Sequence, residues 1–150
     1  MLEWAHVCDA GIAVLNKNGK IKLKKDGCAS YFQWPHDAGR YDFATWEFIN
    51  RTIARNAVSA RGKLLGYGVV TGEPEALRYV ESGSFRLAVS DTVVLYTDGF
   101  TPYFSLASFR NVIAHVSSHI LLQKKIVDLA RQYQKKEGWN REKSLIVIKV

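Results

Sequence analysis

The segment Asn16–Gly19 constrains the fold more than any other part of this chain, because its Asn-Gly pair supplies the positive φ angles of a tight hairpin turn. The turn follows the mostly apolar, β-prone segment 4–15. After the turn, Lys20, Lys22 and Lys24 alternate with two apolar residues, which is the period-two pattern of a strand with one wet face and one buried face. The sequence therefore predicts a β-hairpin in this region.

Helical and strand-like patterns alternate along the rest of the chain. Apolar residues at helical spacing predict a helix over 45–58, with Thr45 as its N-cap. Unbroken apolar runs predict buried strands at 92–96 and 144–150. The other expected elements are a helical turn at 73–80, a strand at 84–87, and helices at 106–116 and 119–136, the last stopped by Gly138.

Length and composition bound the class of protein. A chain of 150 residues is long enough for one hydrophobic core, so residues 1–150 are interpreted as a single domain. No apolar run approaches the roughly 20 residues that span a bilayer, and the first residues do not resemble an export signal. Cys8 and Cys28 have no metal-binding or disulfide-framework spacing, so we expect reduced thiols and a cytoplasmic protein without a membrane partner.

The formal net charge of +7 points to an acidic partner, such as nucleic acid, phosphorylated protein or a membrane surface. The alternating lysines, with Tyr31, Phe32 and Trp34 downstream, are compatible with a nucleic-acid-binding face. Lysines also protect an edge strand from aggregation. We favour the edge-strand interpretation, because no nucleic-acid-binding motif accompanies these residues.

Asp98 stands at the end of the predicted strand 92–96 and is followed by Gly99. A rigid strand can aim a metal-binding carboxylate at this position, and the glycine permits a sharp exit. The same Asp-Gly pair is also typical of an ordinary turn. Both interpretations remain open from these two residues alone.

The wider pattern, Ser90-Asp91, an apolar run, Thr97-Asp98-Gly99, two helices and a final strand, resembles the C-terminal part of the protein phosphatase 2C family. These are metal-dependent serine/threonine phosphatases, and the resemblance implies that Asp98 binds metal. Segment 6–11 is similar to the family's Val-Gly-Asp-Ser-Arg segment and makes Asp9 a second candidate ligand.

The stretch from residue 141 to residue 148 is similar to the family's closing Asp-Asp/Asn-x-Thr and apolar strand. This chain has Arg141 where the family has a metal-binding aspartate, and Glu142, one position away, is the third candidate. The family's Asp-Gly-x-Gly-Gly segment does not occur within residues 1–150, so the resemblance covers about half of a catalytic domain.

The resemblance implies an α+β fold: an incomplete antiparallel β-sandwich flanked by helices. It implies hydrolysis of phosphate monoesters on phosphoproteins with Mn²⁺ or Mg²⁺, and no further catalytic residue is assigned. Because half a domain leaves strand edges uncovered, we expect self-association or a complementing segment. The alternative is a catalytically inactive phosphatase-like module that binds or regulates a protein partner.

Two other patterns are interpreted as structural. His115 and His119 have the spacing of two imidazoles on one helix face, but no third ligand stands nearby in the sequence. Gly66, Gly68 and Gly72 do not form a dinucleotide-binding motif and predict a close-packed loop.

Overall fold

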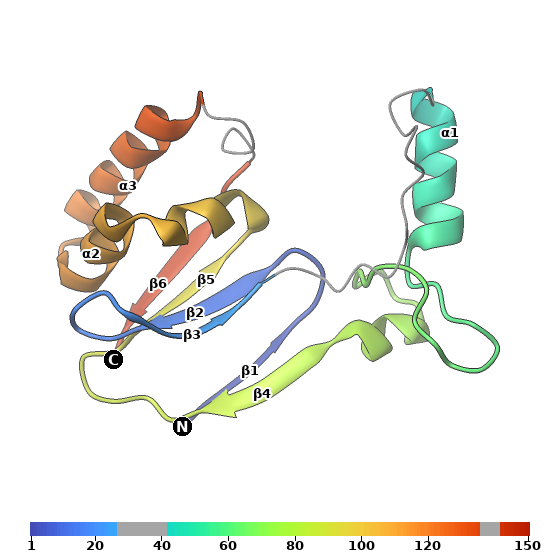
Figure 1. Ribbon diagram of the computed structural model, residues 1–150, viewed down its shortest axis with the longest axis horizontal. Coiled ribbons are helices and arrows are strands. Elements are labelled where there is room, and N and C mark those ends of the chain that lie inside the picture. Colours follow the sequence, from blue (N-terminus) through green and yellow to red (C-terminus); the bar gives the residue numbers. More distant parts are fainter. Residues whose placement is uncertain (27–41, 136–141) are drawn as a thin grey trace. The chain divides into compact units, whose positions relative to one another are not determined.

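The computed structural model describes residues 1–26, 42–135 and 142–150 (Figure 1). Their contacts separate into two compact units. The first unit contains Met1–Trp4, Asp9–Gly27 and Gly83–Val150, and the second contains Ala5–Cys8 and Cys28–Ser82. Among the helices of the described residues, none has both the length and the apolar character needed to cross a bilayer. The fold is mixed α/β with antiparallel sheets, as the α+β class requires.

A four-stranded antiparallel sheet forms the centre of the first unit. Its spatial order is β3 (Ile21–Lys25), β2 (Gly11–Leu15), β5 (Thr92–Tyr96) and β6 (Leu145–Lys149). The predicted hairpin is confirmed as β2 and β3, which pair antiparallel with a register shift between Val14 and Leu15. The predicted single buried face of β3 was wrong, because Ile21 packs against the main core cluster and Leu23 against the second cluster.

The turn of this hairpin uses the chemistry that its sequence indicates. Gly19 has a φ of 73°, and the Asn16 side-chain oxygen accepts hydrogen bonds from the backbone N–H groups of Asn18 and Lys20. An asparagine that bonds to its own turn in this way stabilises the reversal before β3 begins.

Segment 4–15 does not form one strand. It is divided into β1 (Leu2–His6) and β2 by a turn in which Cys8 has a φ of 63°. β1 pairs with β4 (Glu81–Phe85) in a separate two-stranded sheet. The apolar composition of this segment correctly predicted strands. It did not predict the break between them, because Cys rarely takes the left-handed backbone conformation.

The main core lies between the four-stranded sheet and the helices α2 (Ala107–His115) and α3 (His119–Tyr133), which lie on the same side of the sheet in Figure 1. A 3₁₀ helix, Asp98–Ser105, carries aromatic residues into this core. The Tyr96 and Phe104 rings lie 4.5 Å apart, and those of Phe100 and Phe109 are stacked at 5.6 Å. The predicted helices at 106–116 and 119–136 are thus confirmed, although α3 ends at Tyr133.

The other face of the sheet is only partly covered. Ile12, Val14 and Val93 form a second buried cluster there, and four apolar residues from segments 2–4 and 85–87 pack against it. Leu95, however, is 38% exposed, and Ile146 and Ile148 are 58% and 48% exposed. The prediction that strand 92–96 is buried on both faces was therefore wrong at Leu95. The prediction of a buried strand at 144–150 was wrong at Ile146 and Ile148, because β6 stands at one end of the sheet order.

In the second unit the predicted helix 45–58 is shorter and begins differently. It consists of α1 (Phe43–Phe48) followed by a π-helix, Ile49–Ala54. Asp42 caps it: its carboxylate accepts the Thr45 N–H at 2.8 Å, so Thr45 is not the N-cap. After Ala54 the chain leaves the helix, and Asn56 has a φ of 52°.

Beyond the end of the helix, the Asn56 side chain is hydrogen-bonded to the backbone of Val69. Its amide donates to the Val69 carbonyl and accepts from the Val69 N–H, both at 2.8 Å. The predicted helical turn at 73–80 is confirmed as the 3₁₀ helix Pro74–Tyr79. Gly66 and Gly68 are packed so closely that a Cβ on either would collide with neighbouring atoms, which confirms the close-packed loop at these two positions. At Gly72 the prediction was wrong, because a Cβ there would meet no atom within 4 Å.

Candidate metal centre at one end of the sheet

The candidate ligands Asp9 and Asp98 lie at the same end of the sheet, at the ends of neighbouring strands. Gly11 is the register partner of Tyr96. Asp9 precedes Gly11 by two residues, and Asp98 follows Tyr96 by two residues. The structure therefore places these two residues, almost ninety positions apart in the chain, beyond neighbouring strand ends, before the start of β2 and after the end of β5.

Asp98 is half-buried and begins the 3₁₀ helix Asp98–Ser105, so it sits on backbone held by the sheet on one side and by the aromatic core on the other. Thr97, just before it, fixes this end of β5 to the segment leading into β6. The Thr97 N–H donates to the Ser144 carbonyl at 3.1 Å, and the Ser144 N–H donates to the Thr97 hydroxyl at 3.0 Å. These two hydrogen bonds hold the backbone next to Asp98.

Glu142 lies at the same end of the sheet but one residue out of register. Continuing the pairing of Thr97 with Ser144 puts Lys143, not Glu142, opposite Asp98. Glu142 is exposed, and its backbone carbonyl lies over Gly99, where a Cβ would come within 2.2 Å of the oxygen. Glu142 is therefore not the residue that the continued pairing places opposite Asp98. Arg141, the predicted replacement at the ligand position, lies outside the described residues.

A fourth carboxylate, Asp26, follows β3 at this end of the sheet and was missed by the sequence reasoning. The sequence does place Asp26 directly after a predicted strand. In the structure, the Ile12–Lys25 pairing brings the end of β3 beside the start of β2. Asp26 accepts a hydrogen bond from Lys24 Nζ at 2.6 Å. Burial and, next, the negative charge of Asp26 raise the pKa of the Tyr96 phenol above its usual value.

The donor chemistry at this end of the sheet fits a hard cation only in part. Carboxylate oxygens are the ligands that Mg²⁺ and Mn²⁺ prefer, and Mg²⁺ sites often combine one or two carboxylates with waters and substrate phosphates. Within residues 1–26, 42–135 and 142–150, however, no three His, Cys, Asp or Glu side chains are grouped closely enough to hold a metal ion together. The described residues supply a pair of carboxylates and not a complete ligand set.

The opposite end of the sheet carries Asp91, which the sequence pattern matched to the Gly-Asp pair of the phosphatase strand. Ser90 has a φ of 72°, a conformation that favours glycine. Asp91 is 3% exposed and accepts hydrogen bonds from Lys22 Nζ at 2.5 Å and from the Ala88 N–H at 2.8 Å. It fixes a turn and an edge strand, so its position is explained by structure.

The lysines of the edge strand are largely used within the fold. Lys22 pairs with Asp91 and Lys24 with Asp26, while Lys20 is exposed. β3 does stand at one end of the sheet order, as the edge-strand interpretation requires. The aromatic residues 31–34 lie outside the described part of the chain, so the nucleic-acid alternative stays a prediction.

The two histidines do not share a helix. His115 is the last residue of α2, where its Nδ1 is hydrogen-bonded with the Asn111 carbonyl at 2.9 Å, and His119 is the first residue of α3. The break between the helices removes the i, i+4 geometry that a metal pair would need.

Comparison with known proteins gave no matching family model, no similar curated protein and no similar solved structure.

Proposed function

We propose that this chain is a phosphatase-like module whose sheet end contributes Asp98 and Asp9 to a Mn²⁺ or Mg²⁺ site. With ligands from a complementing segment, this site would hydrolyse phosphate monoesters on phosphoproteins. The observation that carries the proposal is the placement of both carboxylates at the ends of adjacent central strands. The resemblance to the C-terminal part of protein phosphatase 2C, with an incomplete antiparallel β-sandwich flanked by helices, belongs to the same proposal.

A metal site at this end of the sheet would neutralise negative charge on the phosphate of the substrate. A divalent cation bound there would polarise phosphate oxygens and lower the pKa of a bound water. The residues of this chain would hold the cation: Asp98 from a rigid strand end, and Asp9 from the turn before β2. The hydrogen bonds between Thr97 and Ser144 would keep Asp98 in place when its carboxylate changes partners.

Calorimetric titration with Mn²⁺ tests the metal site directly. We expect stoichiometric binding to the natural chain and at least about tenfold weaker binding to Asp98→Asn, which removes the charge with little change of shape. Asp128→Asn is the matched control, because Asp128 is an exposed carboxylate on α3, outside the site. Equal Mn²⁺ affinity for Asp98→Asn and the natural chain would exclude Asp98 as a ligand.

Phosphate release tests the reaction. A phosphopeptide is incubated with Mn²⁺ and the chain, with and without a complementing segment. We expect release only when the segment is present, and we expect this release to depend on Mn²⁺ and to disappear in Asp98→Asn. Absence of release with every phosphopeptide, while Mn²⁺ still binds, would restrict the proposal to metal binding.

The second candidate function is a phosphatase-like binding or regulatory module without catalysis. The exposed apolar residues Leu95, Ile146 and Ile148, which lie on one face of β5 and β6, favour it, because such patches mark interaction sites. Absence of Mn²⁺ binding, together with a folded circular dichroism spectrum that is the same with and without Mn²⁺, would support this candidate over the first.

A further inference from the structure

The outer edge of β6 carries backbone groups that point away from its partner strand. The Val150 N–H donates to the Asp91 carbonyl at 3.0 Å, and the Ser144 carbonyl accepts from Thr97 at 3.1 Å, so residues 144 and 150 face β5. Because the direction of these groups alternates along an antiparallel strand, Leu145, Val147 and Lys149 direct theirs outward. Among the described strands, β6 pairs with β5 alone.

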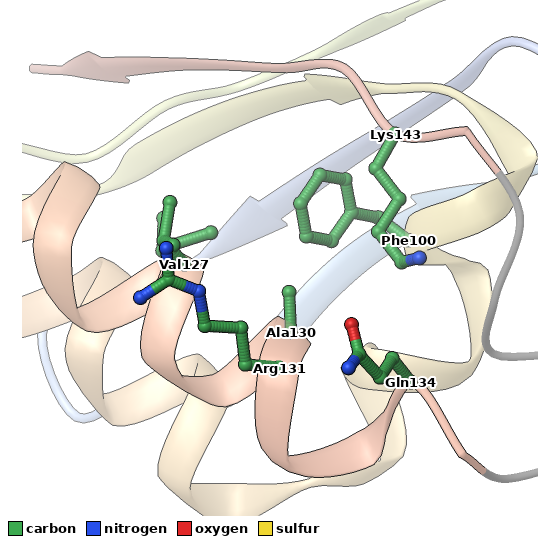
Figure 2. A pocket seen from close by; sticks show the side chains of 7 residues that line it. Phe100, Val127, Ala130, Arg131, Gln134 and Lys143 are labelled. Carbon is green, nitrogen blue, oxygen red and sulfur yellow. The ribbon is translucent and has the colours of Figure 1, made fainter.

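A groove runs beside this edge, between β6 and α3. One part is a cavity of about 420 Å³ that contains Phe100, Val127 and Arg131 in its wall, and Figure 2 shows Lys143 beside the Phe100 ring, with Gln134 at the end of α3. The other part, about 430 Å³, shares Phe100, Val127 and Lys143 and adds the groove-facing side chains of β6. The two parts together follow β6 from Lys143 to Val147.

The opposite face of the same edge is apolar and exposed. Leu95 and Ile146 are register partners on β5 and β6, and Ile148 follows two residues later on the same face. A strand added beside β6 would therefore place alternate side chains in the α3 groove and on the Leu95–Ile146 face. Both faces would be apolar, so the added strand needs a continuous apolar run.

Charge distinguishes between possible occupants of this edge. The two parts of the groove are lined by Lys143, Arg131 and His119 and by no Asp or Glu among the described residues. The Lys143 ammonium, 5.8 Å from the Tyr103 ring centroid, is held at the groove end by a cation–π contact. A second copy of this chain would bring another formal charge of +7 against this rim. An acidic segment would instead meet opposite charge.

We propose that the β6 edge and the α3 groove bind an extended segment of a partner protein, in which a short apolar run is flanked by acidic residues. The segment adds a strand to β6 through main-chain hydrogen bonds, and its acidic flank lies near Arg131 and Lys143. This binding does not depend on the proposed metal site, which lies at Asp9 and Asp98, so either proposal can fail without the other.

Fluorescence anisotropy with a labelled probe peptide, Glu-Glu-Val-Ile-Val-Glu-Glu, tests the proposal on the full chain. We expect saturable binding that weakens several-fold between about 0.05 M and about 0.5 M NaCl, since salt screens exposed charges. The same apolar run flanked by lysines should bind at least about tenfold more weakly. Failure of the acidic probe to bind, or equal binding of the basic one, would overturn the proposal.

One modified probe and two protein variants separate edge pairing from non-specific attraction. A probe with N-methylated amides at alternate positions loses the donors that pair with β6, and we expect its binding to disappear while the protein stays untouched. Arg131→Glu should weaken the acidic probe by about five- to tenfold. Lys125→Glu, the same charge change on another exposed position of α3, should leave binding within about twofold. Full binding of the methylated probe would refute strand addition.

Sedimentation velocity examines the competing occupant. A chain that remains monomeric over the concentrations used for anisotropy supports the acidic segment as the occupant. A dimer that excludes the probe would show that a second copy covers β6 and would overturn the proposal.

Discussion

Asp91 is the residue whose replacement tests the interpretation of the sheet most directly. Its side chain is buried, yet it is charged, because Lys22 Nζ lies 2.5 Å from one carboxylate oxygen and the Ala88 N–H donates to it at 2.8 Å. The pair joins the edge strand β3 to the turn before β5. Removing the carboxylate should therefore loosen both elements together.

The expected loss follows from the two hydrogen bonds. Bonds to a charged group contribute roughly 1.5–3 kcal/mol each. The Lys22 side chain is 29% exposed, so its share belongs at the low end. We expect Asp91→Ala to lower the free energy of unfolding by about 2–4 kcal/mol and Asp91→Asn, which keeps an acceptor for Ala88, by about 1–2 kcal/mol.

The pH dependence adds a second signature. Burial alone raises the pKa of the Asp91 carboxyl, but the hydrogen bonds from Lys22 and Ala88 outweigh it and hold the pKa below the usual 3.8. As the pH falls, the Asp91 carboxyl therefore takes up a proton in the unfolded chain before it does so in the native chain. The contribution of Asp91 is fully present above about pH 4 and is lost as the pH falls through the lowered pKa.

Urea unfolding followed by circular dichroism measures both effects. With a slope of about 2 kcal/mol per M for a small protein, Asp91→Ala should move the midpoint by about 1–2 M. A double-mutant cycle with Lys22→Met should give a coupling energy of about 1–2 kcal/mol. Asp128→Asn serves as the exposed control. A coupling energy near zero would contradict a stabilising ion pair between Lys22 and Asp91. An Asp91→Asn variant whose stability falls at low pH in the same way as that of the natural chain would also contradict it.

Three further substitutions have expected outcomes in the same unfolding assay. Tyr79→Phe removes a hydroxyl that accepts from the Gly66 N–H and donates to the Ala57 carbonyl, and it should cost about 1–3 kcal/mol. Gly99→Ala drives a Cβ against the Glu142 carbonyl and should cost about 1–3 kcal/mol, whereas an unchanged midpoint would show that the two segments separate readily. Burial lowers the pKa of Lys149, so the natural chain should gain stability relative to Lys149→Met as the pH rises towards 10.5; parallel curves from about pH 8 to 10.5 would contradict this.

Local signals in the sequence were sufficient where one residue type dictates backbone geometry. Asn-Gly at the hairpin and the alternating lysines of β3 specified a turn and an edge strand, and both are present. The helices α2 and α3 also followed from apolar spacing. Local signals failed where a non-glycine residue takes a positive φ, at Cys8 and Asn56, because surrounding contacts impose that conformation.

The candidate site shows the same division. The residues around Asp98 were sufficient to predict that it follows an apolar strand, because apolar runs and Asp-Gly pairs act within a few residues of each other. The one-position offset of Glu142 was also visible in the sequence. The shared position of Asp9, Asp26 and Asp98 at one end of the sheet came from the folded structure, since strand register depends on pairing between distant segments. The exposed edge of β6 was likewise decided by tertiary structure, because burial depends on which elements cover a strand and not on how apolar the strand is.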